Sequence, residues 1–340
     1  MLQSMHQPHP RELLLGAQAS QQRLRVCDHY SGVPKRMEKS LQLQSQMTQD
    51  LGVCVFDVTL DCEDGAPVGA EREHAQGVAE LVASSHRNAK IAVRIHALGD
   101  PHFESDMELI VAKVGHLLTH VMVPKVECLQ DIHQVHASLV QHGAKDLPIH
   151  ALIESPFAVS NAFQIASHPS VQSLSFGLMD FVSAHGGAIP SWAMTMQGQF
   201  KHPLMVRAKL EVASACHAYG KTPAHGVVTE IQDLNAIKES ARLANETMGF
   251  TRMWSIHPSQ IEPIVQAMSP SADEVSQASE ILWAAHQAQW GPIQLDGRLH
   301  DRASYRFYWQ IIERAHATAC HVPEQMVALF FQNPVDQGTP

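Results

Sequence analysis

The sequence predicts an α/β fold, a (β/α)8 barrel that is followed by a C-terminal helical extension. Eight short apolar runs, several of them rich in Val and Ile, alternate with segments of helical periodicity between residues 21 and 268. Runs that are apolar on both faces are typical of a parallel sheet covered by helices. A doubly wound open sheet is the alternative, and the absence of G-x-G-x-x-G after the first run weakens it.

Strands and helices alternate in the order that a barrel requires. The candidate strands cover residues 25–30, 53–60, 91–96, 120–124, 149–154, 173–177, 223–228 and 253–257. The helical patterns cover residues 36–48, 70–84, 105–118, 129–141, 157–166, 204–219 and 234–248. Eight strands connected by helices are the count of a (β/α)8 barrel, which needs about 250 residues.

Two segments lie outside the predicted barrel. Residues 1–20 are polar and lack a clear period, which predicts a loose N-terminal tail. Residues 269–340 form the predicted helical extension, with a capping-box sequence at 271–274, a turn-rich loop at 291–301 and a helix with aromatic residues at 304–318. The aromatic residues indicate either ordinary core packing or a lid or oligomer contact, because an appended helix needs a surface to bury against.

Composition excludes several classes of protein. A net charge of −10 without a basic stretch argues against nucleic acid or an anionic membrane as partner, and the 17% charged content argues against disorder. No run reaches the roughly 18 apolar residues of a membrane span, and a cytoplasmic location follows as the default expectation. The six Cys form no C-x-x-C and the 23 His no H-E-x-x-H, so we expect reduced thiols and no zinc.

Two acids, Glu154 and Asp180, each follow a short apolar run. The carboxyl ends of parallel strands form the rim where α/β proteins build their sites. Two carboxylates there indicate a divalent metal held by oxygen ligands, and Mg²⁺ keeps open positions for substrate oxygens. The sequence therefore predicts a Mg²⁺ site in which the metal acts on a 2-oxo acid.

Four further charged residues follow the second and third runs. Asp61, Glu63 and Asp64 lie just past the second run, and Arg94 lies near the end of the third. A solvated loop is the simple interpretation of the acids, and support of the metal site and of Arg94 is the catalytic one. Arg94 suits either an ion pair with Asp61 or Glu63 or a fork for a substrate carboxylate, and the two roles are compatible.

Lys125 ends the fourth run. A Lys at this rim could form a Schiff base with a carbonyl substrate, as in metal-free aldolases. Pairing of its ammonium group with a nearby acid is the favoured interpretation, because Glu154 and Asp180 already indicate a metal.

Six stretches in order resemble the HpcH/HpaI aldolase and citrate lyase β-subunit family. They are LDCED at 60–64, RIH at 94–96, VPKVE at 123–127, ALIESP at 151–156, FGLMD at 176–180 and IHPSQI at 256–261. The resemblance implies a TIM barrel, Mg²⁺ on Glu154 and Asp180, and a substrate carboxylate on Arg94. It also implies carbon–carbon lyase chemistry on coenzyme A thioesters such as citryl or malyl groups, in homotrimers or hexamers whose C-terminal segment reaches a neighbour's site.

The chain departs from the family pattern at three positions. Ser31 stands where the family has Pro, Phe157 where it has Arg, and His225 where it has Asp. These departures bear on the use of coenzyme A and on the acyl group more than on the reaction class.

Two further groups of residues are candidates for binding. Lys35 and Arg36, with Lys39 nearby, could meet the phosphates of coenzyme A or form a solvated helix face. His257 and Gln260 could line the pocket, or their segment could simply start a helix.

The predicted function is a Mg²⁺-dependent lyase that cleaves or forms a 3-hydroxyacyl-CoA thioester, with a small-molecule substrate and a homo-oligomeric state. A class II aldolase acting on free 2-oxo acids is one alternative, and a catalytically silent binding or assembly subunit is another. An acid from a neighbouring subunit's extension, Asp296 or Asp301, is the guess for the general base.

Overall fold

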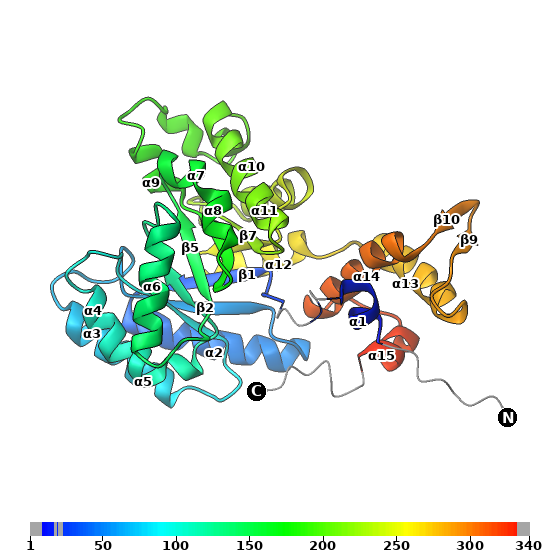
Figure 1. The fold of residues 1–340 in the computed structure, drawn as a ribbon, viewed down its shortest axis with the longest axis horizontal. Coiled ribbons are helices and arrows are strands. Elements are labelled where there is room, and N and C mark those ends of the chain that lie inside the picture. Colours follow the sequence, from blue (N-terminus) through cyan, green and yellow to red (C-terminus); the bar gives the residue numbers. More distant parts are fainter. Residues whose placement is uncertain (1–8, 17–18, 20–22, 332–340) are drawn as a thin grey trace. The chain divides into compact units, whose positions relative to one another are not determined.

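The computed structural model describes residues 9–16, 19 and 23–331, which fall into two compact units (Figure 1). One unit is formed by residues 25–268, and the other by the residues before 25 together with those after 268. The sequence predicts these boundaries after residues 20 and 268. Among the described residues, no helix is both long and apolar enough to cross a bilayer.

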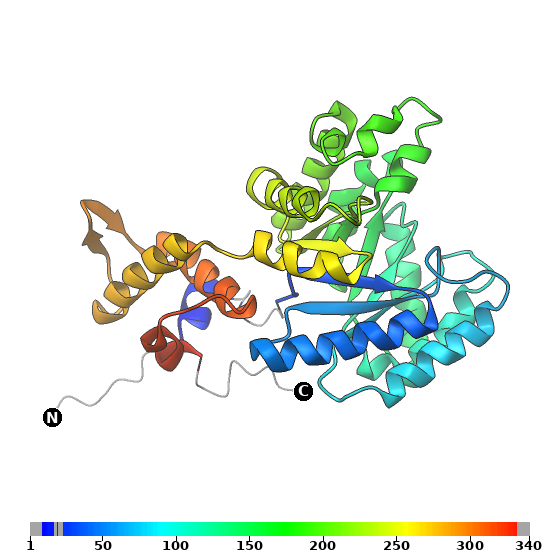
Figure 2. The same cartoon turned by 180° about the vertical axis from the view of Figure 1, so that it is seen from behind.

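The larger unit is a closed barrel of eight parallel strands, which confirms the predicted fold class (Figure 2). Each strand pairs with the next in sequence, and β1 closes the ring by pairing with β8. The strands are β1 Cys27–Ser31, β2 Phe56–Asp61, β3 Ile91–Arg94, β4 Val121–Val123, β5 Ile149–Ile153, β6 Val171–Phe176, β7 Thr222–His225 and β8 Arg252–Ser255.

Helices surround the barrel and bury one apolar face each against the strands. They are α2 Pro34–Leu51, α3 Glu71–Ser84, α4 Phe103–Asp106, α5 Ala112–Val114, α6 Leu129–Gln141, α7 Pro156–Ser160, α8 Ala162–Ser167, α9 Leu178–Ser183, α10 Pro203–Ala218, α11 Leu234–Met248 and α12 Ile261–Met268. The single helix predicted over 105–118 is interrupted by a π-helical turn at Met107–Val111, and the one predicted over 157–166 breaks at Asn161.

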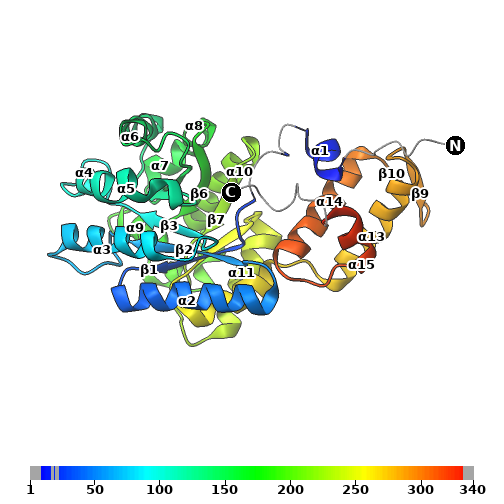
Figure 3. The same cartoon turned by 90° about the horizontal axis from the view of Figure 1, so that it is seen from below.

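The second unit consists mainly of helices (Figure 3), which share an apolar core that includes four aromatic residues, Trp290, Tyr305, Trp309 and Phe330. Its elements are α1 Pro10–Leu15, α13 Ala272–Gln287, β9 Ile293–Leu295, β10 Arg298–His300, α14 Arg302–Ala317 and α15 Glu324–Phe330. Tyr305 and Trp309 are fully buried in this core, whereas Phe307 is 58% exposed. The role of this extension as a lid or oligomer contact stays a prediction.

Three features of this unit can be compared with the sequence prediction, namely the capping box, the turn-rich loop and the N-terminal tail. The predicted capping box is present, since Ser271 Oγ accepts the Glu274 N–H and Glu274 accepts the Ser271 N–H. The predicted loop at 291–301 is a β-hairpin whose turn places Asp296 and Gly297 at positive φ. Within the predicted loose tail, residues 10–15 are instead the helix α1, because Leu14 and Leu15 are buried in the core of this unit.

Candidate functional site

The predicted site residues follow consecutive strands of the barrel. Asp61 ends β2 and Arg94 ends β3, and the two are directly paired in the strand register. Lys125 comes two residues after β4, Glu154 follows β5, and Asp180 lies in the first turn of α9 after β6. Because β2 to β6 are neighbours in the sheet, these side chains occupy one arc of the carboxyl rim.

Asp61 holds Arg94 in a two-pronged ion pair. Arg94 Nε donates to Asp61 Oδ1 at 2.7 Å, and Nη2 donates to Oδ2 at 2.5 Å. The same carboxylate accepts the backbone N–H groups of Glu63 and Gly65 at 3.0 and 2.9 Å. A Cβ on Gly65 would lie 2.2 Å from Asp61 Oδ2, so the loop can approach the carboxylate only because residue 65 is glycine. The predicted ion pair is thus present, and the backbone of the loop at residues 63–65 holds its carboxylate in place.

Glu63 links Arg94 to Lys125. Its Oε2 lies 3.2 Å from Arg94 Nη1, and its Oε1 accepts from Lys125 Nζ at 2.6 Å. The hydrogen bond to Glu63 raises the pKa of Lys125 above its ordinary value. A Schiff-base Lys needs a lowered pKa, so the geometry favours the structural ammonium over the metal-free mechanism.

Lys125 and Gly177 fix the orientation of the Glu154 side chain. Lys125 has a positive φ of 54°, which is rare for a residue other than glycine, and its N–H donates to Glu154 Oε1 at 2.6 Å. A Cβ on Gly177 would lie 2.6 Å from both the Cβ and Oε2 of Glu154, so this close approach requires glycine. Backbone strain at one strand end and a glycine at the next therefore fix this carboxylate at the rim.

The acids of the rim also influence one another's charge. Glu154 is 5% exposed, and burial, with the charge of Asp180, raises its pKa to about 8. Burial raises the pKa of Glu63, but the charge of Arg94 and the hydrogen bond from Lys125 outweigh it, and the pKa lies below its ordinary value. Burial and the charge of Glu63 raise the pKa of Asp64, which is exposed beside them. Glu154 and Asp180 follow adjacent strands and could hold Mg²⁺, an ion that prefers oxygen ligands, and this assignment stays a prediction.

The remaining candidates take different places. Lys35 and Arg36 are exposed in the first turn of α2, directly after β1, where they face solvent as either interpretation requires. His257 is exposed and caps the turn at Pro258–Gln260 by accepting the Ser259 N–H. Gln260 is 1% exposed and bridges two loops, accepting from Ile256 N and donating to Val228 O. Its amide therefore links two loops, and its role in lining the pocket stays a prediction.

The guessed general bases lie in the second unit. Asp296 forms the hairpin turn, and Asp301 caps α14 by accepting the Ala303 and Ser304 N–H groups. An N-cap role explains Asp301 without chemistry.

The three positions of departure have distinct surroundings. Ser31 ends β1 and is buried, whereas Phe157 in α7 is 60% exposed. His225 ends β7, is fully buried and stacks on Phe200 with ring centroids 5.4 Å apart. His225 is therefore a neutral packing residue whose pKa is lowered by burial.

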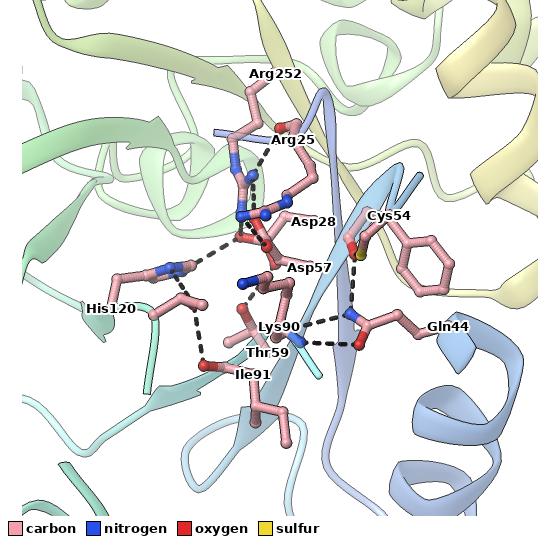
Figure 4. Close-up of polar contacts among 12 residues, drawn as sticks. Arg25, Asp28, Gln44, Cys54, Asp57, Thr59, Lys90, Ile91, His120 and Arg252 are labelled. Atoms are coloured by element: carbon pink, nitrogen blue, oxygen red, sulfur yellow. Dashed lines mark hydrogen bonds and ion pairs between the residues drawn. The ribbon is translucent and has the colours of Figure 1, made fainter. Parts of the chain in front are cut away.

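Sequence reasoning missed a second charged cluster inside the barrel (Figure 4). Arg252 on β8 donates to Asp57 at 2.6 Å and lies 2.7 Å from Asp28 Oδ2. Thr59 donates to Asp28 Oδ1 at 2.7 Å, and all three charged residues are fully buried. Charges inside apolar runs, as at Asp28, Asp57 and Arg252, were the signal that could have revealed it.

Asp28, His120 and His150 bring potential metal-ligand atoms within 4.8 Å of one another. The two imidazoles, however, stack with centroids 3.5 Å apart and planes 13° apart. A metal lies in the plane of each imidazole that binds it, and two nearly parallel planes at this spacing share no such position. Arg252 already neutralises Asp28, and burial lowers the pKa of both His residues. The stacked rings and the pairing of Asp28 with Arg252 therefore favour a buried ion-pair network over a second metal centre.

Comparison with known proteins agrees with the barrel fold and identifies the family of the chain. The family described as HpcH/HpaI aldolase/citrate lyase matches residues 41–258. An L-malyl-CoA/beta-methylmalyl-CoA lyase of Rhodobacter capsulatus is 27% identical in an alignment of 279 positions that covers 76% of this chain and 86% of that protein. A malyl-CoA/beta-methylmalyl-CoA/citramalyl-CoA lyase of Chloroflexus aurantiacus is 29% identical over 77% of this chain and 81% of its own.

Solved structures show the same similarity. A citrate lyase of Burkholderia xenovorans LB400 superposes with a TM-score of 0.79 and 46% identity, over 95% of this chain and 99% of that one. The CitE protein of Mycobacterium tuberculosis, solved with magnesium, acetoacetate and coenzyme A, superposes with a TM-score of 0.63 and 21% identity, over 86% and 98%. At this identity the second likeness speaks for the fold alone.

Proposed function

The chain belongs to the HpcH/HpaI aldolase/citrate lyase family and is a carbon–carbon lyase, and from this premise we propose that it cleaves or forms a 3-hydroxyacyl thioester of coenzyme A with the help of Mg²⁺. The proposed substrates are of the malyl, methylmalyl, citramalyl or citryl type, as the names of its relatives suggest. The identity of the acyl group and the requirement for Mg²⁺ are both parts of this proposal.

The observation that carries the proposal is the pair of oxygen donors at the ends of two adjacent strands. Glu154 is fixed by the Lys125 N–H and by the close approach of Gly177, and Asp180 follows the neighbouring strand β6. Two carboxylates leave most positions of an octahedral Mg²⁺ open to water or to substrate oxygens. When bound, Mg²⁺ would supply positive charge where the substrate's carboxylate and hydroxyl or keto oxygen meet.

The protein's own groups would orient the substrate. The guanidinium group of Arg94 has five N–H donors, and Asp61 accepts two of them, one on Nε and one on Nη2. The group therefore keeps further donors for an anionic substrate group. Because Asp61 and the Glu63 loop hold Arg94 in place before substrate arrives, its charge needs no reorganisation during the reaction. Arg94 would thus bind the carboxylate and stabilise negative charge that develops beside it.

The coenzyme would approach from the side of β1. Lys35 and Arg36 stand in the first turn of α2, where the helix N-terminus also favours anions. Both side chains are exposed and follow the carboxyl end of β1, on the same rim as Glu154. This placement suits the phosphates of coenzyme A, and it leaves the acyl group to reach the metal pair.

The test is direct turnover by the purified full chain. We would offer malyl-CoA, methylmalyl-CoA, citramalyl-CoA and citryl-CoA with Mg²⁺ and follow release of the 2-oxo acid, with EDTA as the control. Turnover of at least one thioester that stops in EDTA and in Glu154→Gln is expected. If only free hydroxy or oxo acids are turned over, the protein is a class II aldolase and the thioester proposal fails. If no substrate is turned over and Mg²⁺ leaves the melting temperature unchanged, the proposed metal site is refuted as well.

A further inference from the structure

Between the rim and the lower ion-pair network, the barrel interior holds a layer of apolar side chains, one from each of five strands. They are Tyr30, Met122, Leu152, Ala224 and Trp254, and Val227 from the loop after β7 packs against them. Leu152 lies two residues before Glu154, and Tyr30 pairs in register with Thr59, two residues before Asp61. Side chains two positions apart on a strand point to the same side, and two residues span roughly 7 Å. These six residues therefore form the floor of the rim site.

Tyr30 and Trp254 are the two aromatic residues of the floor, and their rings stack on each other. The ring centroids are 4.2 Å apart and the planes 26° apart. The guanidinium carbon of Arg94 lies 5.6 Å from the centre of the Tyr30 ring, within the range of a cation–π contact. This contact places the aromatic pair directly beside the residue that is proposed to bind the substrate carboxylate.

Every cation that lies near the floor in the described part of the chain already faces acids. At the rim these cations are Arg94 and Lys125, and below the floor Arg252 is balanced by two buried carboxylates. The Tyr30 hydroxyl group and Trp254 Nε1 make no hydrogen bond to a described residue, but both are neutral donors. A substrate carboxylate at this depth would lose its water without gaining a cation, which is costly, whereas a hydrogen atom or a methyl group has no such cost.

The chemistry of the proposed reaction directs one substituent of the substrate toward the floor. The hydroxyl-bearing carbon of the thioester carries the acyl chain, the hydroxyl group, a carboxylate and one variable group. The hydroxyl group and the carboxylate would face the metal pair and Arg94, and the acyl chain leads back to the coenzyme at the rim. The variable group is then left to point into the barrel. It is hydrogen in malyl and methylmalyl esters, methyl in citramalyl esters and carboxymethyl in citryl esters.

Resting on the proposed thioester lyase function, we propose that Tyr30 and Trp254 determine which oxo acid this site releases. The stacked rings cover the place of the variable group and admit hydrogen or methyl, so the product is glyoxylate or pyruvate. The carboxymethyl group of a citryl ester would bring a charge to a place where each neighbouring cation is already paired. The site is therefore selective for malyl, methylmalyl and citramalyl esters and rejects citryl esters.

The first test is the order of substrates for the wild-type chain. We would measure kcat/KM for cleavage of malyl-CoA, citramalyl-CoA and citryl-CoA with Mg²⁺ and expect the better of the first two to exceed citryl-CoA by at least about 100-fold. Calorimetry with the free oxo acids and Mg²⁺ measures the same preference without turnover, and glyoxylate or pyruvate should bind more tightly than oxaloacetate.

Trp254→Ala tests the floor itself, because it opens space below the rim. Its preferred probe is the ethyl homologue of citramalyl-CoA, which releases 2-oxobutanoate. The ratio of kcat/KM for this ester to that for malyl-CoA should rise by roughly ten-fold or more over wild type, since one methylene in an apolar pocket is worth about 10- to 200-fold. Phe250→Leu is the matched control: Phe250 is fully buried in the outer core between strands and helices, so its loss should lower the melting temperature and leave this ratio unchanged.

Two results would overturn the proposal and keep the lyase function. One is a wild-type chain that cleaves citryl-CoA as well as or better than the other esters. The other is an unchanged ratio in Trp254→Ala, or in Tyr30→Leu if Trp254→Ala fails to fold. If instead the wild-type chain cleaves no thioester, the proposed function fails and takes the selectivity of the floor with it.

Discussion

Replacing Asp61 by Asn tests whether the ion pair at the rim is essential for the fold. Asp61 is 2% exposed and accepts four N–H groups, two from Arg94 and two from the backbone of Glu63 and Gly65. An Asn side chain offers one acceptor oxygen, and its amide group would point hydrogens at two of these donors. Arg94 would remain buried, with Glu63 as its nearest acid at 3.2 Å.

Removing one partner of a buried ion pair costs about 3 to 5 kcal/mol, and the remaining Glu63 places the expected loss near the lower value. For a unit of this size, a loss of about 3 kcal/mol lowers the melting temperature by roughly 6 to 12 °C. Thermal unfolding of the metal-free chain, followed by circular dichroism, measures it.

Glu239→Gln is the matched control, since Glu239 pairs with Arg242 in the same two-pronged manner on the exposed surface of α11. Solvent screens such a pair, so no measurable change in melting temperature is expected. If Asp61→Asn is as stable as Glu239→Gln, the reasoning that Arg94 depends on Asp61 is refuted.

Three further predictions concern the metal pair and Lys125. The pKa of Glu154 in the folded, metal-free chain is about 8 and lies above its ordinary value, so the stability of the chain in EDTA falls as the pH rises toward 8. Glu154→Gln should therefore melt at a higher temperature than wild type at about pH 8.5 but not at about pH 5.5. An equal difference in melting temperature at both pH values would contradict this prediction. Gly177→Ala should cost about 1 to 3 kcal/mol and weaken Mg²⁺ binding in calorimetry, whereas Gly77→Ala in α3, with nothing within 4 Å of its added carbon, should stabilise slightly. Borohydride with pyruvate should not inactivate the enzyme while EDTA does, and covalent trapping at Lys125 in mass spectra would reverse that assignment.

The rim could be predicted because strand ends are legible in the sequence. Glu154 and Asp180 each break an apolar run, and parallel strands bring such ends together whatever the details of packing. The predicted strand at 53–60 begins three residues early relative to β2, which starts at Phe56, but its end is only one residue short of Asp61. An error at the amino end of a strand leaves the site unchanged.

Contacts that depend on closure of the barrel could not be predicted. Arg252 reaches Asp57 across 195 positions of sequence only because β8 pairs with β1 and β1 with β2. The positive φ of Lys125 turns its N–H toward Glu154, and the sequence could not predict it because Lys seldom adopts a positive φ. The segment that includes α9 has no helical period of its own, and its structure follows from packing onto the barrel.

The balance of charge differs between the two polar layers of the barrel, and this difference favours the rim as the place of the proposed metal. The lower layer balances two carboxylates with two guanidinium groups, namely Asp28, Asp57, Arg25 and Arg252. The rim layer carries five carboxylates, namely Asp61, Glu63, Asp64, Glu154 and Asp180, and two cations, Arg94 and Lys125. The rim thus has three more carboxylates than cations, and burial with the charge of Asp180 raises the pKa of Glu154 to about 8, which favours a proton on this carboxyl group at neutral pH. A divalent cation would offset most of this excess negative charge, so uptake of Mg²⁺ at neutral pH should release a proton, which calorimetry in buffers of different ionisation enthalpy would detect.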